Sequence, residues 1–167
     1  NMTGMDKEGI KDLIKGRYDA AAERGDGEGA ACCAGTGSAS PCLAADPVTY
    51  TEDEISLVPE TAFKLSRGCG NPTGFANLQS GEVVVDFGCG AGMDVVLAAR
   101  AVGPEGKVIG VDFAPHMIER AQQTVTEAKI TETTEFLRAD VERIELADGL
   151  ADVVISNCVI NLSPDKQ

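Results

Sequence analysis

Three glycines at alternate positions follow an apolar run that contains an acid, and this part of the chain is best suited to contact a small molecule. The run covers residues 83–87 and includes Asp86, and the glycines are Gly88, Gly90 and Gly92. A short apolar run of this kind predicts a buried strand. Glycines placed directly after a strand let the chain turn sharply and let a ligand approach the backbone closely. The sequence therefore predicts a binding turn between a strand and a helix.

The spacing of the glycines bears on the kind of ligand. A dinucleotide-binding turn has glycines at the first, third and sixth positions, but the sixth position counted from Gly88 is Met93. A nicotinamide or flavin ligand is therefore disfavoured. The pattern Asp-x-Gly-x-Gly-x-Gly resembles the first motif of class I methyltransferases that use S-adenosylmethionine. This resemblance implies that Gly88, Gly90 and Gly92 line the methionine part of that cofactor and that Asp86 also belongs to the cofactor site.

Two further acids stand at the ends of predicted strands. Asp112 ends an apolar run 24 residues after Gly88, a distance that fits one strand-helix-strand crossover, and Asp140 follows a shorter run. A carboxylate at the end of the second strand can accept hydrogen bonds from both ribose hydroxyls, which makes Asp112 the predicted ribose ligand. The resemblance implies that Asp140 and Met117 contact the adenine. For Asp140 the alternative of a helix cap or turn stays open, and for Met117 that of core packing.

Composition and charge exclude several classes of partner. The 167 residues include 14 basic and 27 acidic ones, giving a formal net charge of -13. Such a charge repels phosphate backbones and anionic lipid surfaces, so neither nucleic acid nor a membrane is expected as a partner. No apolar run approaches the ~20 residues needed to span a bilayer, and the N-terminus lacks a signal pattern. The sequence predicts a cytoplasmic protein that acts on a small molecule.

Strand and helix signals alternate along the second half of the chain. The predicted strands cover residues 82–86, 108–112, 135–137 and 152–156, and the predicted helices cover 93–102 and 115–129. This alternation predicts an α/β fold with a parallel sheet, right-handed crossovers and the strand order 3-2-1-4. We therefore expect residues 81–167 to form a Rossmann-like, class I methyltransferase domain, truncated after strand four. The incomplete sheet leaves strand four at an edge, which predicts self-association.

Residues 1–80 are expected to form a helical extension. Apolar side chains three and four residues apart predict an amphipathic helix over residues 5–23. Thr51 begins a capping-box pattern before a second helix, and Pro59 can open a third. Residues 24–41 contain no bulky apolar side chain. This Gly/Ala-rich, cysteine-bearing loop cannot bury a core of its own.

Six cysteines without a secretory signal are more often metal-binding, catalytic or buried than disulfide-bonded. They are Cys32, Cys33, Cys42, Cys69, Cys89 and Cys158. The absence of a C-x-x-C pair argues against a zinc ribbon or an iron-sulfur cluster. For Cys42 and Cys89 we expect a role as buried core residues.

Two segments resemble arsenite S-adenosylmethionine methyltransferases, and the resemblance extends from about residue 18 to residue 167. One segment reads Gly-Cys-Gly-Asn-Pro around Cys69, and the other reads Ser-Asn-Cys-Val-Ile-Asn-Leu-Ser-Pro-Asp-Lys around Cys158. The resemblance implies that Cys69 and Cys158 hold arsenic(III) as thiolates, that Cys32 or Cys33 completes the site, and that Asn157 belongs to the cofactor site. Thiolates suit this thiophilic element.

Methyl transfer to arsenic requires no general base in this family, because the arsenic lone pair attacks the sulfonium methyl group directly. The protein would supply proximity, alignment and exclusion of water. Two alternatives stay open. One is a methyltransferase of the same fold that acts on a quinone or another small organic acceptor. The other is a module that binds the cofactor or arsenite without turnover.

Overall fold

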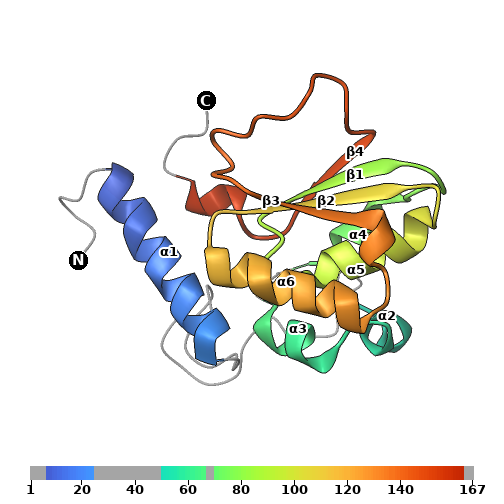
Figure 1. Cartoon of the computed structure of the whole chain (residues 1–167), viewed down its shortest axis with the longest axis horizontal. Helices are drawn as coiled ribbons and strands as arrows, with labels where there is room; N and C mark the ends of the chain where they lie inside the picture. The colour runs from blue at the N-terminus through green and yellow to red at the C-terminus, as the bar shows by residue number, and fades with distance from the viewer. Residues whose placement is uncertain (1–6, 25–49, 67–69, 164–167) are drawn as a thin grey trace.

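A computed structural model of the chain describes residues 7–24, 50–66 and 70–163 (Figure 1). It contains one parallel sheet with the strand order β3-β2-β1-β4. The strands are β1 (Val83–Phe87), β2 (Lys107–Asp112), β3 (Thr134–Arg138) and β4 (Val153–Ser156). The predicted α/β fold and strand order are confirmed, and every predicted strand boundary lies within one residue of the observed one.

The register of the sheet brings the functional strand ends together. Phe87 at the end of β1 pairs with Ser156 at the end of β4 and lies beside Val111 of β2. The glycine turn, Asp112 and the segment that follows β4 therefore leave the sheet at the same edge. In an open α/β sheet this carboxyl edge is where ligands bind.

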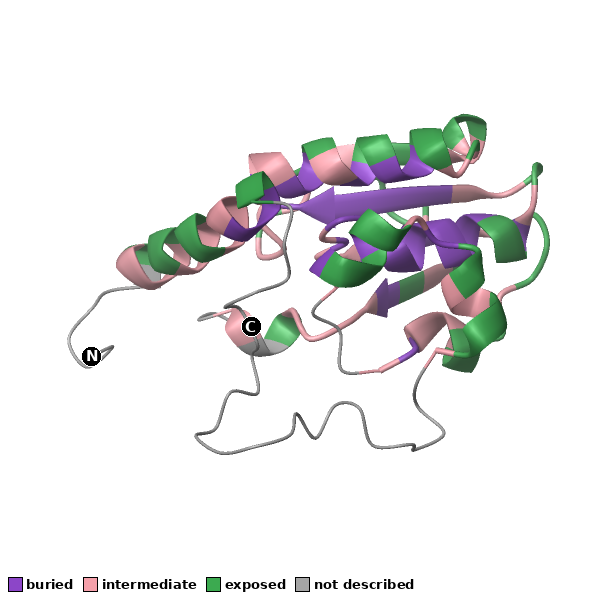
Figure 2. Cartoon of the chain, turned by 90° about the horizontal axis from the view of Figure 1, so that it is seen from below, coloured by how far each residue is buried: buried purple, intermediate pink, exposed green. Residues whose placement is uncertain are grey.

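Two helices cover one face of the sheet. They are α5 (Met93–Val102) and α6 (Pro115–Glu127), which connect β1 to β2 and β2 to β3. Eight of the ten α5 residues are buried, so this helix lies in the centre of the domain. It ends at Gly103, whose φ of 70° terminates it as the sequence predicted. Figure 2 shows the buried residues concentrated in the strands and on the helix faces turned toward them.

The opposite face of the sheet is covered by a long connection rather than by a helix. Val85, Ile109 and Val111 form a second buried cluster, and Ile144 and Leu146 from the β3–β4 connection pack against it. In Figure 1 this connection arches over the sheet between β3 and β4. Its hydrophobic residues supply the cover that a crossover helix provides in a complete α/β unit.

The N-terminal helices pack against the same domain. Helix α1 (Lys7–Arg24) lies against α6, where Arg120 Nε donates a hydrogen bond to the carbonyl of Ala22 at 2.9 Å. Helices α2 (Glu52–Ser56) and α3 (Glu60–Leu65) follow. The capping box predicted at Thr51 is confirmed, since its hydroxyl accepts from Glu54 N and the Glu54 carboxylate accepts from Thr51 N. The cysteine-bearing loop predicted over residues 24–41 falls outside the described residues, apart from residue 24.

One short helix was not predicted. Helix α4 (Pro72–Ala76) begins at the last residue of the Gly-Cys-Gly-Asn-Pro segment. Asn71 caps it by accepting a hydrogen bond from Gly74 N at 2.9 Å, and Pro72 occupies its first turn. Both residues are typical of helix starts. None of the helices in the described ranges is both long and apolar enough to cross a membrane.

Candidate active site

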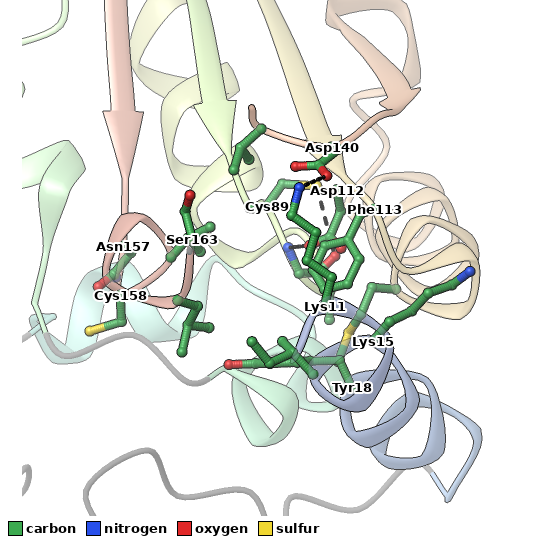
Figure 3. A pocket seen from close by; sticks show the side chains of 18 of the residues that line it. Lys11, Lys15, Tyr18, Cys89, Asp112, Phe113, Asp140, Asn157, Cys158 and Ser163 are labelled. Atoms are coloured by element: carbon green, nitrogen blue, oxygen red, sulfur yellow. Dashed lines mark hydrogen bonds and ion pairs between the residues drawn. The ribbon is translucent and has the colours of Figure 1, made fainter. Parts of the chain in front are cut away.

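A cavity of about 260 Å3 opens at the carboxyl edge of the sheet. Its size lies near the lower end of small-molecule sites, roughly 300 to 1,000 Å3. Its walls come from α1, the glycine turn, the end of β2, the loop after β3 and the segment after β4. The predicted site residues that line it are Gly88, Gly90, Asp112, Met117, Asp140, Asn157 and Cys158. Figure 3 shows Asn157 and Cys158 on one side of this space and Lys11, Asp112 and Asp140 on the other.

The three glycines of the turn have positive φ values of 76°, 52° and 87°, but they make room for different neighbours. A Cβ at Gly88 would lie 2.1 Å from Cγ2 of Val159, and one at Gly92 would lie 3.2 Å from Cα of Ala121. A Cβ at Gly90 would meet no described atom within 4 Å. Gly90 is therefore the position whose bare backbone faces open space in the cavity. Gly92 instead allows close packing of the turn against α6.

Asp112 connects the end of β2 to the glycine turn. Its Oδ2 accepts from Gly90 N and its Oδ1 accepts from Ala114 N, both at 2.9 Å. The side chain is buried, and this burial raises the pKa of Asp112, while the backbone hydrogen bonds act in the opposite direction. Each carboxylate oxygen has a second lone pair. Asp112 can therefore hold the turn and still accept a hydrogen bond from a ligand in the cavity.

Asp140 is engaged by a lysine that sequence reasoning missed. Lys11 Nζ of α1 lies 2.6 Å from Asp140 Oδ2 and 2.5 Å from Glu142 Oε2, and Figure 3 shows it reaching across to Asp140. The hydrogen bonds to these two acids raise the pKa of Lys11. Tyr18 of α1 also lines the cavity, and it lies seven residues from Lys11, which places both on one face of the helix. That spacing is the signal that could have pointed to Lys11.

Asp86 lies in the core and outside the cavity lining. It is 1% exposed, and its Oδ2 has no hydrogen-bond partner among the residues that the structure describes. Burial raises the pKa of Asp86 well above its ordinary value, and the nearby Asp94 and Asp112 raise it further. A direct cofactor contact by Asp86 or Gly92 stays a prediction that the cavity lining does not support.

Asn157 belongs to a network of polar groups at the cavity wall. Its Nδ2 lies 2.8 Å from the carbonyl oxygen of Gly70, 3.0 Å from the hydroxyl of Tyr50 and 3.2 Å from Asp94 Oδ2, so its two N–H groups are shared among three acceptors. The Tyr50 hydroxyl donates to Asp94 Oδ1 at 2.7 Å. Burial is the main cause that raises the pKa of Asp94, and it also raises the pKa of Tyr50. The structure thus adds Asp94 to the cavity lining, and Tyr50 contacts Asn157 and Asp94 without lining the cavity.

Cys158 follows directly and lines the cavity in a conformation that is unusual for its type. Its φ is +57°, in the left-handed region, and the side chain is half-buried. Non-glycine residues in this region are uncommon and cluster at functional sites. Cys158 is thus the described cysteine that combines cavity access with backbone strain.

Cys89 is buried as expected, but it also lines the cavity, which was not expected. Burial raises the pKa of Cys89, as do the nearby Asp112 and Asp86, so this residue stays a neutral thiol. The other predicted arsenic ligands, Cys69 and one of Cys32 and Cys33, lie outside the described residues, as does Cys42. Within the described ranges no group of three or more His, Cys, Asp or Glu side chains could hold a metal ion.

A parallel sheet with this strand order and a glycine turn beside an acid at the end of β2 defines a methyltransferase-type domain. The methyltransferase domain family matches residues 78–167, and the chain belongs to this family. The resemblance inferred from the sequence is thereby confirmed at the level of the family.

Several individual relatives of the chain are arsenite methyltransferases. The chain is 39% identical to an arsenite methyltransferase of Halobacterium salinarum, over 97% of this chain and 43% of that protein. It is 38% identical to one of Aquipseudomonas alcaligenes, over 75% of this chain and 37% of that protein. A crystal structure of an arsenic(III) S-adenosylmethionine methyltransferase from Chlamydomonas reinhardtii superimposes with a TM-score of 0.60 and 37% identity, over 68% of this chain and 40% of that one. The chain spans about two fifths of the length of these relatives.

Proposed function

We propose that this chain binds S-adenosylmethionine in the cavity at the carboxyl edge of the sheet and serves methyl transfer to trivalent arsenic held by cysteine thiolates. The arsenite methyltransferases to which the chain is similar support this reaction. The observation that carries the proposal is that the glycine turn, Asp112 and Cys158 all line one cavity.

The residues of the cavity fit this cofactor. The open space beside Gly90, where no described atom would meet a Cβ, allows a ligand to approach the backbone. Asp112 presents a buried carboxylate to accept hydrogen bonds from ribose hydroxyls, and Met117 and Asp140 line the part of the cavity proposed for the adenine. S-adenosylmethionine, when bound, supplies an electrophilic methyl group on a sulfonium.

The proposed role of the cysteines is to hold arsenic as a nucleophile. Cys158 stands at the cavity wall, and we propose Cys69 as a second thiolate, with Cys32 or Cys33 completing the set. Thiolate ligands hold arsenic in the trivalent state, so its lone pair would form the new carbon–arsenic bond as the carbon–sulfur bond of the sulfonium breaks and the thioether leaves with that electron pair. The methylated arsenic would then be formally pentavalent, and a thiol reductant, oxidised to its disulfide, would return it to the trivalent state. No proton leaves the nucleophile in this step, so none of the acids needs to act as a base. The walls would contribute alignment and exclusion of water.

Two measurements test the proposal. Calorimetry with S-adenosylmethionine tests binding, and mass spectrometry of products from arsenite, a thiol reductant and methyl-labelled cofactor tests transfer. We expect Cys158→Ser to abolish methylated arsenic and Cys42→Ser to leave it unchanged. Loss of cofactor binding in the wild-type chain would contradict the proposal. Binding without methylated arsenic would favour a module without turnover. Methyl transfer to a quinone or another organic acceptor that is unchanged in Cys158→Ser would favour that alternative.

A further inference from the structure

The side-chain amide of Asn157 joins parts of the chain that are far apart in sequence. Its Nδ2 lies within hydrogen-bond distance of Gly70, which is 87 residues away, and of Tyr50, which is 107 residues away. It also reaches Asp94 at the start of α5. The residue that follows Asn157 is Cys158, and the residue that precedes Gly70 is Cys69. One amide group therefore connects the neighbours of two cysteines.

The chemistry of the network fixes the orientation of this amide. A carbonyl oxygen and a carboxylate oxygen can only accept, so the nitrogen of Asn157 must face Gly70 and Asp94. The Tyr50 hydroxyl donates to Asp94 and is then available to accept from Asn157. Burial raises the pKa of Tyr50, which keeps its hydroxyl protonated as a donor. A partly buried network of this kind favours a single arrangement of its side chains.

A second, separate contact holds the residue beside Gly70. Asn71 Nδ2 donates to Oε1 and Oε2 of Glu54, each at 3.0 Å, while Asn71 Oδ1 accepts from Gly74 N and caps α4. Glu54 is itself fixed by the capping box with Thr51. Gly70 and Asn71 are therefore anchored on two sides, by Asn157 after β4 and by Glu54 of α2. A capping role alone would not require the contact between Gly70 and Asn157.

We infer that Asn157 is a positioning residue that holds the backbone at Gly70 against the backbone that precedes Cys158, with Tyr50 and Asp94 fixing its amide. The inference rests on the proposed function, in which Cys69 and Cys158 bind one arsenic atom. Two thiolates can chelate one atom only if the segments that carry them are kept side by side. Asn157 acts through these segments and need not contact arsenic.

The first test measures proximity without arsenic or cofactor. In a background in which the cysteines other than Cys69 and Cys158 are replaced, diamide oxidises the two remaining thiols to a disulfide and is itself reduced. We expect rapid coupling in this background and coupling at least tenfold slower after Tyr50→Phe or Asn157→Leu. Tyr50→Phe removes one hydroxyl and keeps the shape of the ring, so it tests the network even if Asn157→Leu fails to fold.

A second test measures ligand affinity in the chain with all its cysteines. We expect Tyr50→Phe to weaken arsenite binding at least tenfold while the dissociation constant for S-adenosylmethionine changes less than twofold. Ser156→Ala is the matched control, since it removes a hydroxyl that donates to the Phe87 carbonyl at 3.0 Å, one residue before Asn157. It should lower the melting temperature as much as Tyr50→Phe does and leave the coupling rate unchanged.

The outcomes separate the inference from the proposed function. If the wild-type chain fails to bind arsenite but Tyr50→Phe still slows the coupling, the proposed function fails and the positioning role stands. If the cysteine pair does not couple in the wild-type background, or couples at the same rate in a folded Tyr50→Phe variant, the positioning role is overturned. If Ser156→Ala slowed the disulfide coupling as much as Tyr50→Phe does, the positioning role would likewise be overturned, because a general loss of stability would then explain the slower coupling.

Discussion

Asp112 holds Gly90 through a hydrogen bond of 2.9 Å from the glycine N–H to the carboxylate, so the acid that ends β2 fixes the turn that follows β1. The two residues are 22 positions apart: Asp112 ends β2, and Gly90 lies in the turn that follows the neighbouring strand β1. Gly90 is the glycine beside open space, and Asp112 is buried next to it. The shape of the turn and the proposed ribose acceptor therefore depend on the same side chain.

Removal of this carboxylate should weaken cofactor binding. We expect Asp112→Ala to reduce the affinity for S-adenosylmethionine by about 1 to 3 kcal/mol, because a buried charged acceptor and the hold on Gly90 are lost together. Isothermal titration measures the effect. Asp152→Asn is the control, since Asp152 Oδ2 accepts from Val83 N at 2.8 Å at the opposite end of the sheet. An unchanged dissociation constant in Asp112→Ala would contradict the ribose role.

The strained backbone at Cys158 should be relieved by glycine. Cys158 has a φ of 57° and Lys129 a φ of 58°, so both residues occupy the left-handed region. Glycine at either position should stabilise the fold by up to about 1 kcal/mol. Chemical denaturation measures this gain. Only Cys158→Gly should abolish arsenite binding, because only this substitution removes a proposed arsenic ligand. If Lys129→Gly also lost arsenite binding, the loss in Cys158→Gly could not be assigned to the missing thiolate.

The buried acid beneath the site should make stability fall as pH rises. Burial raises the folded-state pKa of Asp86 above its ordinary value of 3.8. A raised carboxyl pKa gives a contribution that is fully present below pH 3.8 and is lost as the pH rises through the folded-state pKa. We expect Asp86→Asn to flatten this part of the pH dependence and to raise the free energy of unfolding at neutral pH. Denaturant titrations from about pH 4 to about pH 8 test it, with the exposed Asp148→Asn as control.

The edge of β4 should promote self-association. In the described residues β4 pairs only with β1, and Val154 on this strand is 54% exposed. Light scattering at high concentration should give a mass above that of one chain, and Val154→Lys should return it to one chain because charge at an edge opposes pairing. Glu135→Gln on the opposite edge strand β3 should have no effect. A single-chain mass for the wild type would refute this prediction.

Local sequence patterns predicted the strands, helix α5 and the order of the strands in the sheet. The apolar runs determined the strands, and their alternation with helical segments determined the strand order. Helix α5 was predicted over its full length because Gly103 and Pro104 end it. The acids at strand ends were also recognisable, since a polar residue after a buried run is visible in the sequence. These features depend on neighbours along the chain.

The contacts that complete the site depend on residues far apart in sequence and leave no periodic signal. Lys11 meets Asp140 across 129 residues, and Tyr50 meets Asn157 across 107. Sequence reasoning assigned Asp140 and Asn157 to the cofactor site, which stays a prediction, but it could not reveal their contacts with Lys11 and Tyr50. The three glycines were all assigned to cofactor binding, because the residues that they face in the fold were also not visible in the sequence. Their spacing could not reveal that Gly92 faces Ala121 and Gly88 faces Val159.

Gly88, the first glycine of the turn, also makes room for the side chain of Val159. Any side chain at Gly88 would collide with Val159, the residue directly after Cys158. The turn after β1 and the segment after β4 are therefore closely packed against each other at Gly88 and Val159. A larger residue at position 88 would displace Val159 and with it Cys158. Under the proposed function, a variant at position 88 that seems to be defective in cofactor binding would therefore also be defective in holding arsenic.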